Sequence, residues 1–189
     1  MNADGVLSAD RVSAGDVLIA LGASGLHSNG YSLVRHVLAA TGLRWMPPRR
    51  VLGGRTLADE LLEPTRIYAR DCLALAAECG AHAFAHVTGG GSPRTWRRVL
   101  PPTLDAIVDR STWSPLPIFE LIADLAAVPQ PEMEQTFNLG VGMVALVPPN
   151  TLLTLGARAN ARAHRVARRA HRTRHWVGAN DRHTYAPRR

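Results

Sequence analysis

The feature that most constrains the fold is an apolar segment followed at once by a polar, glycine-rich run and then by a helical pattern. Residues 16–21 (DVLIAL) predict a buried strand, and residues 30–41 predict a helix with one apolar face, ended by Gly42. Between them, residues 22–30 read GASGLHSNG. Backbone N–H groups and short polar side chains therefore converge where a helix begins, which predicts a site for an anion.

A second glycine-rich turn follows another predicted strand. Residues 83–87 predict the strand, and Thr88, Gly89, Gly90 and Gly91 come directly after it. Ligands of α/β sheets gather at the carboxyl ends of strands, where helix N-termini present unpaired N–H groups. Both turns fit that rule, although neither matches the lysine-containing P-loop and the chain has no lysine.

The remaining patterns alternate between helix and strand. Further helices are predicted at residues 56–62, 66–79, from Ser92-Pro93 onward, from Ser114-Pro115 to 125 and at 132–136, and further strands at 104–109 and 142–147. The alternation predicts a sheet covered by helices on both faces.

Five segments share their order and approximate spacing with those of one enzyme family. They are GDVLIAL (15–21), GASGLHSNGYSLVR (22–35), LLEPTRIYARDCLALAAE (61–78), HVTGGG (86–91) and MEQTFNLGVGM (133–143). On these segments residues 5–149 resemble the aminoimidazole ribonucleotide synthetases, also called phosphoribosylformylglycinamidine cyclo-ligases. The resemblance implies the family's C-terminal domain, an α+β fold built as an α/β/α three-layer sandwich around a mixed sheet.

The resemblance also implies a reaction in purine biosynthesis that uses ATP and Mg²⁺. ATP phosphorylates the formyl oxygen of formylglycinamidine ribonucleotide, a nitrogen attacks to close the ring, and phosphate leaves. No residue is assigned as a metal ligand. The positions implied to bind substrate or phosphate are Ser24, Gly25, His27, Ser28, Asn29, Gly30, Thr88, Gly89, Gly90 and Gly91.

His27 is the one titratable group of the first polar run and the candidate catalytic residue. It has two possible roles, as a general acid or base or as a hydrogen-bonding residue that orders the loop. Glu63 and Arg66 are expected to form a structural ion pair rather than to face the cleft. His86 is expected to be a packed histidine, and Asn138 to make a turn bond.

Arginine is concentrated in the last part of the chain. Residues 151–189 hold ten of the 22 arginines against one acidic residue, and they lack a clean amphipathic period. Residues 1–150 are therefore expected to form the cyclo-ligase-like domain, and residues 151–189 an arginine-rich tail that is disordered or the product of a shifted reading frame. An arginine-rich tail could bind nucleic acid through phosphates, but it has few aromatic residues for stacking.

The resemblance leaves the family's N-terminal domain unmatched. That domain supplies much of the ATP site and of the homodimer core, so the chain is expected to be inactive alone and to need a separately encoded partner domain. Sibling ATP-dependent enzymes are the alternative: formylglycinamidine ribonucleotide synthetase, selenophosphate synthetase or thiamine-monophosphate kinase. No apolar run approaches the roughly 20 residues of a membrane span, and no signal peptide is evident, so a cytoplasmic protein without a membrane partner is expected.

Overall fold

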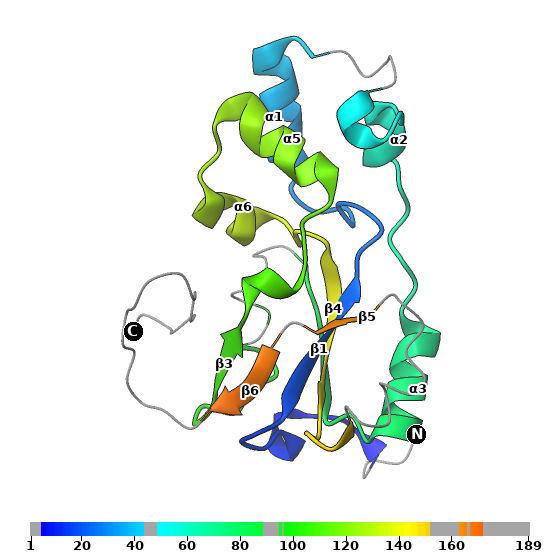
Figure 1. Cartoon of the computed structure of the whole chain (residues 1–189), viewed down its shortest axis with the longest axis vertical. Helices are drawn as coiled ribbons and strands as arrows, with labels where there is room; N and C mark the ends of the chain where they lie inside the picture. The colour runs from blue at the N-terminus through cyan, green and yellow to red at the C-terminus, as the bar shows by residue number, and fades with distance from the viewer. Residues whose placement is uncertain are drawn as a thin grey trace.

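The structure is a computed structural model that describes residues 5–43, 49–88, 95, 97–151, 163–165 and 167–171, the last two ranges by their backbone alone (Figure 1). The strands are β1 (Val17–Gly22), β2 (Ala83–His86), β3 (Asp105–Val108), β4 (Val141–Val147), β5 (Ala163–Arg165) and β6 (Ala167–His171). The helices are α1 (Tyr31–Thr41), α2 (Leu57–Leu61), α3 (Ala69–Cys79), α5 (Pro117–Ala126) and α6 (Gln130–Thr136), with short 3-10 turns at Ala9–Arg11, Arg50–Leu52 and Arg110–Thr112.

The main sheet has the strand order β2-β4-β1-β5, and β3 pairs with β6 in a second, two-stranded sheet. β4 runs antiparallel to both of its neighbours, β1 and β2. β1 and β2 therefore run in the same direction and end at the same edge of the sheet. This places residues 22–30, which follow β1, and Thr88, which follows β2, at one edge.

Both faces of β1 are buried, which explains its unbroken apolar sequence. On one face Val17, Ile19 and Leu21 pack with Tyr68 and with the apolar side of α3. The opposite face packs against β3 and against Trp113, which lies just after it. The residues of β1 and β4 on this second face are Leu18, Ala20, Val141, Val144 and Leu146.

Four helices form a separate cluster at one end of the strands: α1, α2, α5 and α6 (Figure 1). Phe119 of α5 and Phe137 after α6 lie at its centre, with ring centroids 5.5 Å apart. α2 begins with a capping box: the Thr56 side chain accepts from the Asp59 backbone N–H, and the Asp59 carboxylate accepts from the Thr56 backbone N–H. Helices gathered at one end of an antiparallel sheet confirm the α+β class.

The expected mixed sheet with helices on both faces is not what the described residues show. All four described strand pairings are antiparallel, and only α3 lies along the main sheet (Figure 1). The helix expected from Ser92-Pro93 and most of residues 151–189 lie outside the described residues. Within that last segment the backbone forms β5, against β1, and β6, against β3. The nature of the tail stays a prediction.

One helix begins later than the pattern predicts. The periodicity indicated a helix over residues 66–79, whereas α3 begins at Ala69. Arg66 donates its backbone N–H to His27 and a side-chain N–H to the Gly22 carbonyl oxygen. These tertiary bonds hold residues 66–68 outside the helix. Among the described residues, no helix has the length and the apolar character that crossing a membrane requires.

Candidate functional site

The candidate site lies at the edge where β1 and β2 end, on either side of the start of β4. Gly22 is aligned with Val141, and His86 is aligned with Met143. The Val87 N–H donates to the Gly142 carbonyl oxygen over 2.9 Å. The polar loop (residues 22–30) and Thr88 are thus brought to one edge, while Gly89, Gly90 and Gly91 lie outside the described residues.

The polar loop has a left-handed backbone at three positions. His27 has φ 55°, Ser28 has φ 61° and Gly30 has φ 74°. Left-handed backbone costs a non-glycine residue roughly 1–2 kcal/mol, so the surrounding contacts must hold His27 and Ser28 in place. At residue 30 a side chain is excluded altogether, because a Cβ there would be 2.1 Å from Cε1 of Phe137.

A turn at residues 138–140 anchors the loop from one side. The Ala23 N–H donates to the Gly140 carbonyl oxygen over 2.8 Å. Asn138, only 1% exposed, donates from Nδ2 to the Gly25 carbonyl oxygen over 2.9 Å and accepts from the Gly140 N–H over 2.8 Å. The predicted turn bond of Asn138 is confirmed, and the same side chain also holds the loop.

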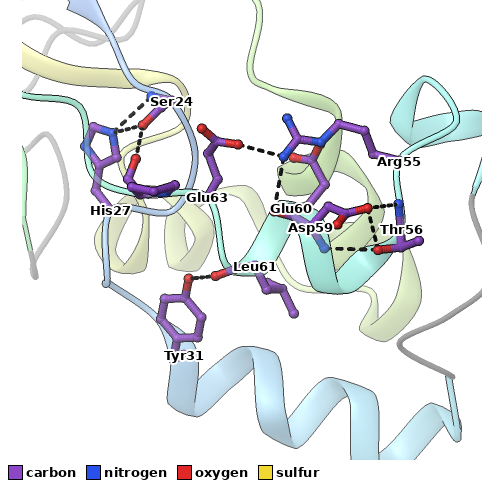
Figure 2. A network of polar contacts seen from close by, with 10 residues as sticks. Ser24, His27, Tyr31, Arg55, Thr56, Asp59, Glu60, Leu61 and Glu63 are labelled. Carbon is purple, nitrogen blue, oxygen red and sulfur yellow. Dashed lines mark hydrogen bonds and ion pairs between the residues drawn. The ribbon is translucent and has the colours of Figure 1, made fainter.

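A second segment, the anchoring segment (residues 64–68), holds the loop from the other side. The Ser24 hydroxyl donates to the Pro64 carbonyl oxygen over 2.6 Å. The same hydroxyl also contacts Nε2 of His27 (Figure 2). The Gly22 carbonyl oxygen accepts two bonds, from the Tyr68 hydroxyl over 2.8 Å and from an Arg66 side-chain nitrogen over 3.2 Å. Two segments distant in the sequence therefore fix the start of the loop.

The hydrogen bonds of His27 determine which of its ring nitrogens carries the proton. Nε2 lies 3.0 Å from the Ser24 backbone nitrogen and 3.4 Å from that of Arg66. Backbone N–H groups only donate, so Nε2 must be the acceptor and Nδ1 must carry the hydrogen. Nδ1 is buried and has no hydrogen-bond partner among the residues that the structure describes.

The surroundings of His27 keep its ring uncharged. Burial of the imidazole, followed by the positive charges of His86 and Arg66, lowers the pKa of His27 to about 4. At neutral pH the ring is therefore a neutral acceptor at Nε2 and a donor at Nδ1. Burial also raises the pKa of Tyr68 to about 12, so its hydroxyl stays protonated and can donate to Gly22.

The structure corrects two expectations for nearby residues. Glu63 and Arg66 do not pair with each other: Glu63 pairs with Arg55 over 2.6 Å (Figure 2), and Arg66 pairs with Asp71 over 2.7 Å. His86 is exposed rather than packed, because it lies at the end of β2, an outer strand among those described. Its ring centroid is 6.4 Å from that of His27.

Sequence reasoning missed Tyr68 as part of this site, and for Arg66 it favoured a structural ion pair over a place facing the cleft. Both residues lie in the LLEPTRIY segment, which otherwise indicated a helix and a family resemblance. The available signal was an arginine two residues and a tyrosine four residues after Pro64, close to the start of an amphipathic helix. That pattern does not reveal a bond to a carbonyl more than 40 residues earlier in the chain.

Comparisons with known proteins identify the family of this chain. A family model described as "AIR synthase related protein, C-terminal domain" matches residues 13–174, which runs past the boundary expected at residue 150. The chain is 53% identical over 139 residues to a Streptomyces fradiae protein provisionally named phosphoribosylformylglycinamidine cyclo-ligase, covering 73% of this chain and 76% of that protein.

Two further relatives are named phosphoribosylformylglycinamidine cyclo-ligase. The one from Anaeromyxobacter dehalogenans (strain 2CP-1 / ATCC BAA-258) is 48% identical over 146 residues, covering 76% of this chain and 41% of the relative. The one from Symbiobacterium thermophilum is 44% identical over 164 residues, covering 84% of this chain and 46% of the relative. The chain thus spans less than half the length of these two relatives. With the family model matched over most of its length, the chain belongs to the AIR synthase related family and carries the C-terminal domain of that family.

Proposed function

We propose that this chain is the C-terminal domain of a phosphoribosylformylglycinamidine cyclo-ligase and that its polar loop binds a phosphate-bearing ligand of that reaction. The family match and the names of the relatives support the reaction class. The observation that carries the site is the anchored loop itself. Residues 22–30 are bonded to two distant segments and lead into the N-terminus of α1.

The loop and the start of α1 suit an anion. The first N–H groups of a helix have no acceptor within the helix and lie at the positive end of its dipole. In α1 this end has Gly30 as its N-cap, no side-chain cap bond and no acidic residue in the first turn. Nothing in that turn therefore opposes a bound phosphate.

His27 supports this site best as a residue that orders the loop and holds a proton at Nδ1. Its Nε2 already accepts from the Ser24 backbone, and a pKa of about 4 lies too far below neutral for an efficient general acid. The neutral ring keeps Nδ1–H as a donor at neutral pH. A general acid or base role for His27 is the weaker alternative.

The reaction places limited chemical demands on this domain. A phosphoryl group passes from ATP to the formyl oxygen of formylglycinamidine ribonucleotide, a nitrogen closes the ring, and phosphate leaves with that oxygen. The loop of this chain would bind and orient a phosphate group of the nucleotide or of the substrate, which contributes through positioning and charge stabilisation.

No magnesium ligand is assigned among the described residues. They contain no group of three or more histidine, cysteine, aspartate or glutamate side chains able to hold a metal ion. We therefore assign no step on this chain to Mg²⁺. ATP, Mg²⁺, the homodimer and the cytoplasmic location belong to the proposal for the complete enzyme, and the three-layer sandwich belongs to the proposal for its C-terminal domain.

The names of the relatives favour the cyclo-ligase over its sibling enzymes. Because the chain spans 41% and 46% of two of them, the proposal includes a partner domain equivalent to the unmatched part. The arginine-rich segment that could bind nucleic acid lies largely outside the described residues, and no described contact favours that function.

A reconstitution assay tests the proposal. The full chain, the unmatched part of the Symbiobacterium relative, and the two together are incubated with ATP, Mg²⁺ and formylglycinamidine ribonucleotide, and ring closure is measured. We expect activity only from the mixture. Ring closure by the chain alone would refute the assignment as a dependent domain, and an inactive mixture in which the two parts form a stable complex would refute the assigned reaction.

A further inference from the structure

We propose that Arg66 and Tyr68 are positioning residues, which hold the polar loop in its binding conformation through the Gly22 carbonyl group. The inference rests on the proposed function, since it takes the polar loop to be the element that binds phosphate. Neither residue is assigned a contact with the ligand. Both act on the point where β1 ends and the loop begins.

Arg66 and Tyr68 share one hydrogen-bond acceptor. The Gly22 carbonyl oxygen accepts from the Tyr68 hydroxyl over 2.8 Å and from the Arg66 guanidinium over 3.2 Å, which uses both of its lone pairs. The register between β1 and β4 shifts between Leu21 and Gly22. Gly22 therefore turns out of the regular ladder, and side chains from the anchoring segment fix its peptide group.

Arg66 connects three structural elements. One terminal nitrogen donates to Gly22, the other pairs with Asp71 of α3 over 2.7 Å, and the guanidinium carbon lies 5.3 Å from the centroid of the Tyr68 ring. Its backbone N–H also reaches Nε2 of His27 over 3.4 Å. The planar guanidinium has two terminal nitrogens that can donate to Gly22 and Asp71 at the same time, whereas a lysine ammonium has a single nitrogen and cannot span both acceptors in this way.

Tyr68 is buried beside a glycine, Gly142. Tyr68 is 5% exposed, and its ring lies 6.0 Å from that of His27 in an edge arrangement. Its hydroxyl fits only because residue 142 has no side chain. The residue between the two, Ile67, is 85% exposed and takes no part in this packing, so it provides a matched control.

The test compares the full chain with Tyr68→Phe, Arg66→Lys and the control Ile67→Ala. Binding of inorganic phosphate is measured from the amide resonances of the loop. Amide exchange is measured at Ser24 and, for the core of the sheet, at Ala85 and Val144. The protonation of the two His27 ring nitrogens is read from their ¹⁵N shifts.

We expect Tyr68→Phe and Arg66→Lys each to raise the Kd for phosphate by about 2–12-fold, the factor that corresponds to one hydrogen bond. They should also speed exchange at Ser24 and mix the two tautomers of His27, while Ala85 and Val144 keep their protection. Ile67→Ala should match the unmodified chain. Unchanged Ser24 exchange and tautomer, or equal loss of protection at Ser24, Ala85 and Val144, would overturn the positioning role.

The two proposals fail in different ways. If the unmodified chain does not bind phosphate, the proposed function of the loop is refuted. The positioning role is then decided by Ser24 exchange and by the His27 tautomer alone, because both are measured without ligand. If phosphate binds equally to all four proteins, the loop function stands and the positioning role is refuted.

Discussion

The Tyr68 hydroxyl occupies the space that a side chain on Gly142 would need. A Cβ at residue 142 would be 2.0 Å from the hydroxyl oxygen of Tyr68 and 2.7 Å from Cε1 of His27. A glycine in β4 thus lets two rings lie against the strand at the edge where the polar loop begins. From there the hydroxyl reaches the Gly22 carbonyl oxygen.

Gly142→Ala is expected to destabilise the chain by about 1–3 kcal/mol, because the added methyl group must displace Tyr68 and His27. Denaturant unfolding measures the loss. Adding Tyr68→Phe should restore part of it, since this change removes the atom nearest to the new methyl group. If Gly142→Ala leaves the free energy of unfolding unchanged, the rings of Tyr68 and His27 do not lie against this strand as described.

Gly30→Ala is expected to lower the free energy of unfolding more than Gly42→Ala does, although both glycines have a left-handed backbone conformation. At Gly42 a Cβ meets nothing within 4 Å, so only the backbone penalty of about 1–2 kcal/mol applies. At Gly30 the Cβ would also collide with Phe137, which adds about 1–3 kcal/mol. Equal losses in thermal or denaturant unfolding would contradict the close contact between Gly30 and Phe137.

Asn138→Ala is expected to lower the free energy of unfolding by about 2–4 kcal/mol, because it leaves the Gly25 carbonyl and the Gly140 N–H without this partner in a buried place. The control is Gln130→Ala, which removes an exposed contact with Glu134 and should change stability little. If the two substitutions have the same small effect, Asn138 does not join the turn to the loop.

The free energy of unfolding is expected to fall as the pH is lowered from 6.5 to about 4, the range between the ordinary pKa of His27 and its pKa in the folded chain. The folded chain protonates His27 only near its pKa of about 4, whereas the unfolded chain protonates it near the ordinary value of 6.5. Between these values the unfolded state binds more protons, so acid favours unfolding.

The matched variant His27→Asn has no group that titrates here, and asparagine tolerates a left-handed backbone. Between pH 8 and pH 5 the unmodified chain should lose about 2 kcal/mol more than this variant, as measured by denaturant unfolding. Parallel pH profiles for the two proteins would show that His27 is not held neutral by the fold.

Local sequence signals predicted much of the framework. The apolar run of β1 and the glycine that ends α1 depend on neighbours within a few residues, and each was confirmed. The placement of both polar turns after strands was also predictable. The meeting of residues 22–30 and Thr88 at one edge follows from β4 running antiparallel to both β1 and β2, a tertiary arrangement that no local pattern shows.

What the sequence did not reveal depends on contacts between distant residues. A helical period extended to Arg66, but bonds to Gly22 and His27 outweigh the helix preference of that residue. Asn138 predicted its own turn, while its bond to Gly25, 113 residues away, leaves no local pattern. The exposure of His86 depends on β2 being an outer strand among those described.

The central claim is that the polar loop is the element that binds phosphate. The most direct measurement is a titration of the ¹⁵N-labelled full chain with inorganic phosphate at constant ionic strength, followed through its amide resonances. We predict saturable shifts at Ser24, His27, Ser28 and Gly30 and in the first turn of α1. Saturable binding without shifts at these residues, or shifts confined to the arginines after residue 157, would contradict the account.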